Sequence, residues 1–468
     1  MIVHKFGGTS IGDAGCFAQV AEIVQAQAAA GEIVVVLSAM SGVTSALVAG
    51  ARAAADGRDD TYRTVKATLL RRHLDVVEEL LANGSLRLEV GGLIEDRLHE
   101  LERLYRSIAV LGELTVRGRD AVAAFGEPLS AHILAAILRQ RGTRAQAISA
   151  AELVVTDDHF GAAVPLWDPT RALLQERLQP WIAQRLVPVV TGYIGATAAG
   201  VTTTLGRGGS DYSAALLGAG LGAEEVWIWS DVDGILTADP NIVPQARTLA
   251  ELSYAEASDL AYFGADVLHP KTIRPVITHG IPLRIRNTFH PEHPGTLIVQ
   301  APGPERRPLP AIISSAGLSL VAVGSADDSW SLPMATRVLQ CLAAASVDVP
   351  MFSRSFSEHS LNLVLREQDR AHGLRLLRQE FAPALAAGTC TLEARERVAT
   401  VSVVGMPGWN HAGIVAHAFA ALGNLGTRVI AVAQAATEHS VSFCIPEEQL
   451  ADTVRFLHRE LGLEDGDG

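Results

Sequence analysis

A cluster of chemically useful side chains follows three threonines in the middle of the chain. The segment Thr202–Asp211 reads TTTLGRGGSD, and its glycines allow tight turns. We expect Ser210 and Asp211 to cap the apolar helix that follows at 212–222, whose first amide groups would attract an anion. The planar guanidinium of Arg207 suits a carboxylate, and the charge of Asp211 suits an ammonium group. The segment therefore predicts an anion cradle beside a clamp for an amino acid.

A second candidate loop lies near the start of the chain. Lys5–Ser10 reads KFGGTS and follows an apolar strand predicted at 1–6. A lysine beside glycine amides suits a phosphoryl group during its transfer, although Lys5 taken alone fits a plain surface charge at a strand end slightly better. The chain contains neither G-x-x-x-x-G-K-[ST] nor G-x-G-x-x-G, so phosphate binding would need a different kind of loop.

Apolar runs and glycine turns alternate through the first 300 residues, and this rhythm predicts the elements that position the two loops. The run at 33–37 is apolar throughout, as in parallel strands covered on both faces. Proline at the first helical position opens a helix predicted at 129–141. The α/β pattern is interrupted at about 61–119, which is helical throughout and breaks at Asn83–Gly84. We interpret this part as a helical excursion from the sheet, with a partner-binding arm as the alternative.

The last third of the chain contains an internal repeat. A proline-rich span at 291–310 marks a domain boundary. Beyond it, the strand-like segments Leu320–Gly324 and Val401–Gly405 each precede a helix and then a motif containing Glu-His-Ser. From glycine to glutamate the gap is 34 residues in one copy and 33 in the other. Two small modules of about seventy residues each are therefore expected.

Size, charge and cysteine content limit the classes of protein. At 468 residues, with 48% hydrophobic residues, the chain should form two or three domains. The net charge of −13 gives no footprint for nucleic acid or an anionic membrane. The four cysteines are scattered without metal-ligand or disulfide spacing, so we expect a reduced, cytoplasmic protein. Neither a signal peptide nor a membrane-spanning run is expected.

Several loops together resemble the signatures of aspartate kinase in the amino-acid kinase superfamily. The C-terminal repeat resembles the paired ACT regulatory modules of the same family. The matching segments, in chain order, are Lys5–Ser10, Leu37–Thr44, Gly126–Glu127, Gly192–Gly195, Thr203–Asp211, Asp231–Gly234 and Val267–Pro270.

The resemblance implies a fold and a domain arrangement. The fold would be α/β, a three-layer sandwich with a mainly parallel sheet, followed by two ferredoxin-like α+β ACT modules. The catalytic domain would cover 1–300 and the modules 311–390 and 391–468. The sequence ends soon after the second module, so no fused homoserine dehydrogenase is expected.

The resemblance also implies roles for individual residues. Lys5 and Asp211 would be catalytic. Substrate binding would involve the side chains of Ser38, Thr44, Glu127, Arg207, Ser210 and Asp211. ATP binding would involve Lys5, Gly7, Gly8, Ser10, Ser230, Asp231 and Leu236.

The implied reaction is ATP-dependent phosphorylation of the side-chain carboxylate of L-aspartate to 4-phospho-L-aspartate, with Mg²⁺ bridging the phosphates. This is the first step of aspartate-family biosynthesis, which leads to lysine and threonine. The residue types agree with that chemistry. A carboxylate nucleophile is already ionised at neutral pH, so catalysis needs alignment and charge neutralisation rather than a general base.

Three positions depart from the family pattern. Tyr193 stands where phenylalanine is usual, Asn241 where arginine is usual, and Asp266 where many relatives have a nucleotide-contacting lysine. The last two remove positive charge that would hold phosphates. Two alternatives therefore stay open: a paralogue that phosphorylates another small carboxylate, and a catalytically silent amino-acid sensor.

The regulatory half is ambiguous. Ser346 and Asp348 lie in a segment that resembles lysine-responsive members, whereas Gln434 matches a glutamine of threonine-responsive members. Arg354 stands at the corresponding place in the first repeat. We expect a homodimer formed through the ACT modules, with lysine or threonine as effector; modules that only dimerise are the alternative.

Overall fold

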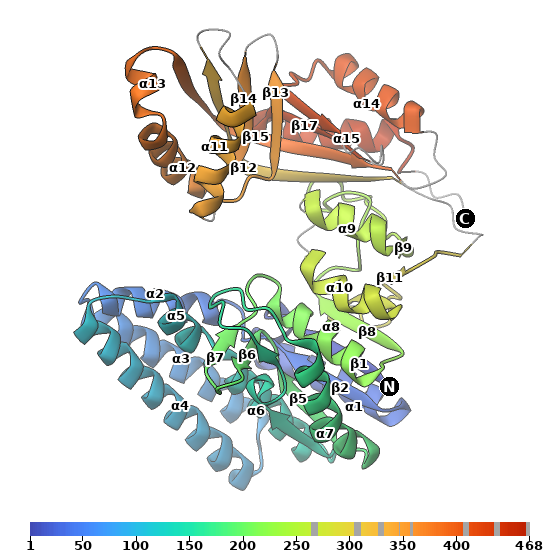
Figure 1. Ribbon diagram of the computed structural model, residues 1–468. Coiled ribbons are helices and arrows are strands. Elements are labelled where there is room, and N and C mark those ends of the chain that lie inside the picture. Colours follow the sequence, from blue (N-terminus) through green and yellow to red (C-terminus); the bar gives the residue numbers. More distant parts are fainter. Residues whose placement is uncertain are drawn as a thin grey trace. The chain divides into compact units, whose positions relative to one another are not determined.

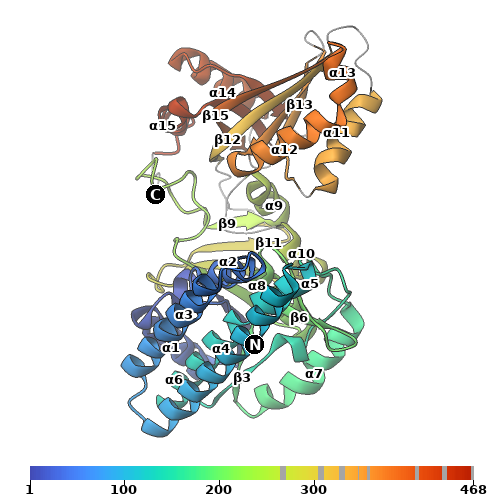
Figure 2. The ribbon, with the colours of Figure 1, turned by 90° about the vertical axis from the view of Figure 1, so that its left-hand side faces the viewer.

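Figures 1 and 2 show the computed structural model, which describes residues 1–263, 270–303, 310–325, 332–345, 347–355, 359–405, 411–434 and 440–464. The chain divides into two compact units, each with its own sheet. The first comprises Met1–Ile235, Ala250–Tyr254 and the described part of Val267–Pro302. The second comprises Leu236–Leu249 and the described parts of Ala255–Asp266 and Gly303–Gly468. The expected boundaries near residues 300 and 390 stay predictions.

The first unit is built on a mainly parallel sheet, as predicted. Its strand order is β3-β5-β2-β1-β8-β10-β11-β9, and β10–β11 is the antiparallel pair. The strands are β1 (Ile2–Phe6), β2 (Ile33–Leu37), β3 (Ala145–Ile148), β5 (Val187–Thr191), β8 (Glu225–Ser230), β9 (Glu251–Ser253), β10 (Leu283–Asn287) and β11 (Thr296–Val299). A small second sheet contains β4 (Val155–Thr156), β6 (Ile194–Thr197) and β7 (Thr202–Thr204).

Helices cover both faces of the parallel sheet (Figure 1). On one face α1 (Ala14–Ala30) and α6 (Gly126–Gln140) pack on the strands and on each other. On the other face α8 (Gly209–Leu221) packs on the strands and contacts α7 (Trp167–Ala183) and α10 (Pro270–His279). All five residues of β2 are buried, which explains why that strand is apolar throughout.

The helical excursion is confirmed. The part predicted at about 61–119 comprises α3 (Asp59–Leu80), α4 (Gly84–Leu111) and the first residues of α5 (Val116–Ala123). Helix α2 (Val43–Ala55) precedes it. The side chain of Asn83 accepts hydrogen bonds from the first amides of α4, so the predicted break is a helix cap. The excursion packs against α1 and α6 (Figure 2). Within the described residues, 116–140 is apolar enough to cross a membrane, but 78% of its most apolar window is buried inside the protein, as in a core helix.

The second unit contains a six-stranded antiparallel sheet in the order β13-β14-β12-β15-β17-β16. Its strands are β12 (Ala311–Ser325), β13 (Met351–Ser355), β14 (Ser360–Arg366), β15 (Cys390–Val404), β16 (Ala431–Gln434) and β17 (Ser440–Pro446). Its helices are α11 (Leu332–Ala344), α12 (Glu367–Glu380), α13 (Ala382–Ala386), α14 (His411–Leu425) and α15 (Leu450–Glu460). A further helix, α9, spans Tyr254–Phe263.

The predicted repeat is confirmed in the order of these elements. Each copy has a long strand, a helix, two shorter strands and a second helix, starting at β12 in one copy and at β15 in the other. The last part of each long strand pairs within its own copy, with β14 or β17. The two long strands also pair with each other, antiparallel, along almost their whole length. The two modules therefore share one continuous sheet.

Two predicted helix starts differ from the structure. Helix α6 begins at Gly126 rather than at Leu129, which places Pro128 third in the helix. Proline is tolerated there because N–H groups of the first turn have no partner within the helix. Helix α8 begins at Gly209 rather than at Tyr212, so Ser210 and Asp211 lie inside its first turn instead of before it.

Candidate active site

The carboxyl ends of β5, β2, β1 and β8 lie side by side, because these strands are parallel neighbours in the sheet. The register aligns Phe6 with Leu37, and Leu37 with Thr191. Backbone hydrogen bonds join the loops that follow: Ser38 N–H donates to the Phe6 carbonyl at 3.2 Å, and Gly192 N–H donates to the Leu37 carbonyl at 2.7 Å. Ligands bind at this edge in α/β sheets.

A pocket of about 440 Å³ opens at this edge. It contains seven residues that the sequence analysis singled out, brought together from distant segments: Lys5, Ser38, Thr44, Glu127, Arg207, Ser210 and Asp211. The rest of the lining consists of Ala39, Gly161, Tyr193, Gly206, Gly208 and Gly209. The roles of these residues stay predictions, but their common location is a property of the fold.

Lys5 and Asp211 form an ion pair at the base of the pocket. The Lys5 Nζ lies 2.6 Å from Oδ1 of Asp211, and the two side chains are 10% and 15% exposed. Lys5 comes from β1 and Asp211 from the first turn of α8. A carboxylate at this distance compensates the charge of the lysine and restricts its orientation.

The start of α8 differs from the predicted cap. The residue before the helix is Gly208, which has a left-handed φ of 68°, and no side chain caps the helix. Ser210 and Asp211 therefore lie within the first turn and line the pocket, instead of bonding back to their own backbone. The helix start still presents amide groups with a partial positive charge, which favours an anion.

Glu127 is a buried acid in the first turn of α6. Burial raises its pKa to about 8, and hydrogen bonds from the backbone N–H groups of Glu127 itself and Ala39 lower the pKa by less. Its Oε2 atom has no hydrogen-bond partner among the described residues. A buried polar atom without a partner is costly, so an ammonium group in the pocket would stabilise this carboxylate.

Glycines let the loops around the pocket touch through their backbones. A Cβ on Gly8 would lie 2.9 Å from the Ala39 carbonyl oxygen, and a Cβ on Gly126 would lie 2.6 Å from the Ala39 Cβ. On the other side of the pocket, a Cβ on Gly192 would lie 2.7 Å from the Ser210 Cβ. These positions are too tight for any side chain, so the position of the loop at 38–44 is fixed from two sides.

Asp120, on α5, is a buried carboxylate that the sequence analysis missed. Its Oδ2 accepts hydrogen bonds from the N–H groups of Gly161 at 2.8 Å and Thr204 at 2.9 Å. Its Oδ1 accepts a third, from the Thr204 hydroxyl, at 2.9 Å. Asp120 thus holds the end of β7 and a lining residue of the pocket. The available signal was an acid in the apolar segment seven residues before Glu127.

The predicted phosphate-side residues lie at the adjacent strand ends. Gly7 N–H donates to the Trp229 carbonyl at 3.3 Å, which joins the end of β1 to the end of β8. The Ser10 hydroxyl is buried and lies 2.7 Å from the Thr288 hydroxyl, so this side chain is engaged within the fold. The hydroxyl of the half-buried Ser230 donates to the carboxylate of the neighbouring, exposed Asp231 at 3.1 Å.

Leu236, the remaining predicted ATP contact, forms an isolated bridge with Thr248. It is the first residue of Leu236–Leu249, which belongs to the second unit.

Two comparisons assign the chain to a family. Residues 1–287 match the model of the amino acid kinase family, and residues 401–461 match that of the ACT domain. The chain is 31% identical over 477 residues to aspartokinase 1, chloroplastic, of Arabidopsis thaliana, an alignment that covers 99% of this chain and 80% of the relative. The chain belongs to the aspartokinases of the amino acid kinase family.

Some similar proteins are much longer than this chain. It is 33% identical over 463 residues to bifunctional aspartokinase/homoserine dehydrogenase 1, chloroplastic, of Zea mays, which covers 97% of this chain and 50% of the relative. A bifunctional relative from Arabidopsis thaliana is 32% identical, with the same coverage. The chain therefore spans about half the length of these bifunctional relatives.

Solved aspartokinase structures extend the likeness to the whole chain. E. coli aspartokinase III in complex with aspartate and ADP, in the R-state, gives a TM-score of 0.82 at 30% identity and covers 99% of this chain and 100% of that one. The same enzyme with lysine and aspartate, in the T-state, gives a TM-score of 0.80 at 31% identity, covering 98% and 99%. The kinase sheet and the antiparallel regulatory sheet are thus both features of known aspartokinases.

Two of the three positions that depart from the family pattern, Tyr193 and Asn241, lie among the described residues. The side chain of Asn241 and its own N–H both donate to Asp239 Oδ1, at 3.0 and 2.9 Å. Tyr193 has a left-handed φ of 69°, which a close-packed turn imposes. Asp266 lies outside the described residues.

Three predicted effector residues belong to the second unit. Asp348 is exposed, with a carboxylate oxygen 4.0 Å from Nε of Arg366. Gln434 ends β16 and is exposed. Ser346 lies outside the described residues. Their binding of an effector stays a prediction.

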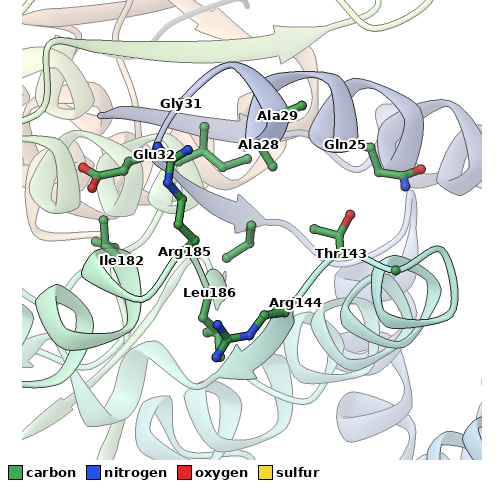
Figure 3. Close-up of a pocket in the computed structure, with 13 residues that line it drawn as sticks. Gln25, Ala28, Ala29, Gly31, Glu32, Thr143, Arg144, Ile182, Arg185 and Leu186 are labelled. Atoms are coloured by element: carbon green, nitrogen blue, oxygen red, sulfur yellow. The ribbon is translucent and has the colours of Figure 1, made fainter.

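A second cavity in the first unit, of about 300 Å³, lies at the amino ends of the strands (Figure 3). Its lining includes Ile33 and Val187, the first residues of β2 and β5, and the side chains of Arg144 and Arg185 border it. None of the residues predicted for catalysis or substrate binding lines it. The pocket at the carboxyl ends is therefore the candidate active site.

Proposed function

We propose that this chain catalyses the transfer of the γ-phosphoryl group of ATP to the side-chain carboxylate of L-aspartate, giving 4-phospho-L-aspartate and ADP. One observation carries the proposal: a single pocket holds Arg207, the buried Glu127 and the Lys5–Asp211 pair. These groups match an α-carboxylate, an ammonium group and a migrating phosphoryl group. The similar E. coli aspartokinase III has been solved with aspartate and ADP, which supports the same substrates here.

In the proposed mechanism, the protein aligns two anions and neutralises their charge. Arg207 and the start of α8 hold the α-carboxylate, and Glu127 holds the ammonium group. Ser38 and Thr44 direct the side-chain carboxylate toward the loop at Gly7. A carboxylate oxygen forms a bond to the γ-phosphorus, and the bond between that phosphorus and the bridging oxygen breaks. ADP leaves with the electron pair, while Lys5 stabilises the charge on the phosphoryl group.

We propose ATP with Mg²⁺ as the phosphoryl donor. In the described part of the chain, no three His, Cys, Asp or Glu side chains come together as a metal cage. Mg²⁺ that binds together with the phosphates of ATP does not need a protein cage, because this ion usually keeps several waters and needs only one or two carboxylates. Asp231 is exposed and directly follows β8, the strand that pairs with β1. Mg²⁺ would neutralise phosphate charge.

Activity across several amino acids tests the reaction. The full chain is incubated with MgATP and L-aspartate, L-glutamate or L-asparagine, and ADP release is measured together with trapping of the acyl phosphate as a hydroxamate. We expect ADP release and hydroxamate formation with L-aspartate and neither with L-glutamate or L-asparagine. Hydroxamate from another carboxylate but not from aspartate would favour the paralogue hypothesis. A lack of turnover combined with no heat on calorimetric titration with MgATP would favour the silent sensor.

We further propose a homodimer formed through the repeat of the second unit, inhibited by lysine. The repeat matches an ACT domain model at 401–461, and the similar E. coli enzyme has been solved with lysine in its T-state. Sedimentation velocity with and without lysine or threonine measures the assembly, and the ADP assay under the same conditions measures inhibition. A monomer, or inhibition by threonine alone, would contradict this part of the proposal.

We place the reaction at the start of the biosynthesis of lysine and threonine from aspartate, and we keep the cytoplasmic location as a prediction. The similar maize and Arabidopsis proteins are chloroplastic. Fractionation of the source cells with an antibody to the chain would decide the location.

A further inference from the structure

Arg72 extends from the helical excursion to two loops of the candidate active site. It lies on α3 and is half-buried. Its Nη1 donates to the carbonyl oxygen of Ser41 at 2.6 Å, and its Nη2 donates to the carbonyl oxygen of Gly12 at 2.9 Å. Ser41 belongs to the loop between β2 and α2, and Gly12 to the loop between β1 and α1. One planar guanidinium therefore bridges both loops.

The two loops also meet through their backbones near this bridge. Ser41 N–H donates to the Gly8 carbonyl at 3.1 Å, so Ser41 contacts the first loop through its N–H and Arg72 through its carbonyl. Gly12 follows the short 3-10 helix at Thr9–Ile11. Carbonyls at a helix end lack partners within the helix, and a charged donor satisfies them strongly.

We propose that Arg72 is a positioning residue that fixes the spacing between the phosphate-side loop at 7–12 and the aspartate-side loop at 38–44. The inference rests on the proposed function, because these loops are assigned there to the two reacting groups. Arg72 does not line the pocket. Its contribution is to the relative position of Ser38 and Gly8, which would set the distance between the attacking carboxylate and the γ-phosphorus.

This role has a kinetic signature. Loss of Arg72 leaves Arg207, Glu127 and Lys5 in place, so the KM values for aspartate and ATP should change by less than about threefold. The value of kcat should fall, because misplacement of reacting groups by about 1 Å can cost about 100-fold in rate. If Arg72 only stabilised the fold, its loss would lower the melting temperature. It would not lower kcat selectively while leaving the KM values nearly unchanged.

The test uses the full chain with Arg72→Ala and Arg72→Lys. Arg71→Ala is the matched control, because Arg71 is the preceding residue of the same helix and is exposed. We expect Arg72→Ala to lower kcat about 100-fold and methylguanidine to restore part of that loss. Arg72→Lys keeps the charge but has one nitrogen for two carbonyls, so an intermediate kcat is expected. Arg71→Ala should match the wild type.

Two results would overturn the proposal: a kcat for Arg72→Ala within threefold of the wild type, or a loss of kcat that follows the melting temperature and does not respond to methylguanidine. If Arg72→Ala does not fold, Arg72→Lys decides: a kcat within threefold of the wild type, or a loss of kcat that follows the melting temperature, would overturn the proposal. Hydrogen exchange separates this inference from the proposed function. Arg72→Ala should exchange faster than Arg71→Ala at both 8–12 and 39–43, even if the wild type does not phosphorylate aspartate, and unchanged exchange at both loops would contradict the bridge.

Discussion

The ammonium nitrogen of Lys5 lies 2.6 Å from Oδ1 of Asp211, and both side chains are largely removed from solvent. The pair joins the first strand of the sheet to the first turn of α8. The sequence analysis expected Asp211 to be catalytic and to bind the substrate, and it did not include a pairing of Asp211 with Lys5. In the structure, the cation paired with Asp211 is the side chain of Lys5.

Asp211→Asn should lower kcat about 100-fold, because Lys5 loses the group that orients it and removal of one electrostatic contact of this kind typically costs that much. Initial rates with saturating aspartate and MgATP measure the effect. The control is Glu224→Gln, which breaks an ion pair of similar length, 2.8 Å, between the chain terminus and a carboxylate that is 78% exposed. Equal rates for Asp211→Asn and the wild type would remove Asp211 from the mechanism.

The KM for aspartate should rise as the pH falls below about 8. Burial raises the pKa of Glu127 to about 8, so its carboxyl group is neutral in the free protein below that pH. Binding an ammonium group favours the carboxylate, so binding must release one proton below pH 8 and none above it. We expect the KM to increase about tenfold per pH unit between about pH 8 and 6 and to level off above pH 8.

Glu127→Gln, which cannot titrate, provides the control for this pH dependence. Its KM for aspartate should be higher and independent of pH over the same range. A wild-type KM for aspartate that stays constant from pH 6 to 9 would contradict the role of Glu127 in holding the ammonium group.

Arg207→Ala should raise the KM for aspartate by at least about 100-fold and the KM for ATP much less. Two charge-assisted hydrogen bonds to the α-carboxylate would be lost, each worth about 1.5–3 kcal/mol. Arg171→Ala, an exposed arginine on α7, serves as the control. A larger increase in the KM for ATP than for aspartate would assign Arg207 to the nucleotide.

Gly126→Ala should raise the KM for aspartate and lower the melting temperature. The added methyl group would lie 2.6 Å from the Ala39 Cβ and would displace the loop that carries Ser38 and Thr44. Gly92→Ala, in the interior of α4, meets no atom within 4 Å and should raise stability by up to about 1 kcal/mol through helix propensity. Similar kinetics for both variants would show that the loop tolerates displacement.

Asp120→Asn should lower the free energy of unfolding by about 3 kcal/mol. The carboxylate accepts three hydrogen bonds from Gly161 and Thr204, and an amide nitrogen at Oδ1 or Oδ2 would face a donor. Urea unfolding measures the change. Asp75→Asn, on the exposed face of α3, should stay within about 0.5 kcal/mol of the wild type. If Asp120→Asn lowered the free energy of unfolding no more than Asp75→Asn, the hydrogen bonds of Asp120 would contribute little to stability.

Local sequence patterns predicted most of the fold. The apolar run at 33–37 corresponds to β2, and the Asn83–Gly84 break is the start of α4. Both follow from short-range rules, because strand and helix periodicity and capping depend on residues within a few positions. The repeat was equally visible, since its two copies place the same motifs at nearly the same spacing.

The start of α8 shows where local rules were insufficient. Ser210 and Asp211 are typical caps, but Gly208 adopts a left-handed conformation and the helix begins before them. Whether these side chains bond to their own backbone or face a pocket depends on that one backbone angle. Glycine adopts either sign of φ, so the residue type alone does not fix this angle.

The sequence by itself determined which residue types stand at the strand ends, and therefore that an anion cradle and an amino-acid clamp were available. Only the tertiary structure decided that Asp211 pairs with Lys5 and that Asp120 and Arg72 hold the loops. It also decided that Glu127 is buried, with one oxygen that has no hydrogen-bond partner in the described part of the chain. The physical reason is that these contacts join segments far apart in the chain. The order of strands and the packing of the helical excursion bring them together, and local periodicity contains no information about either.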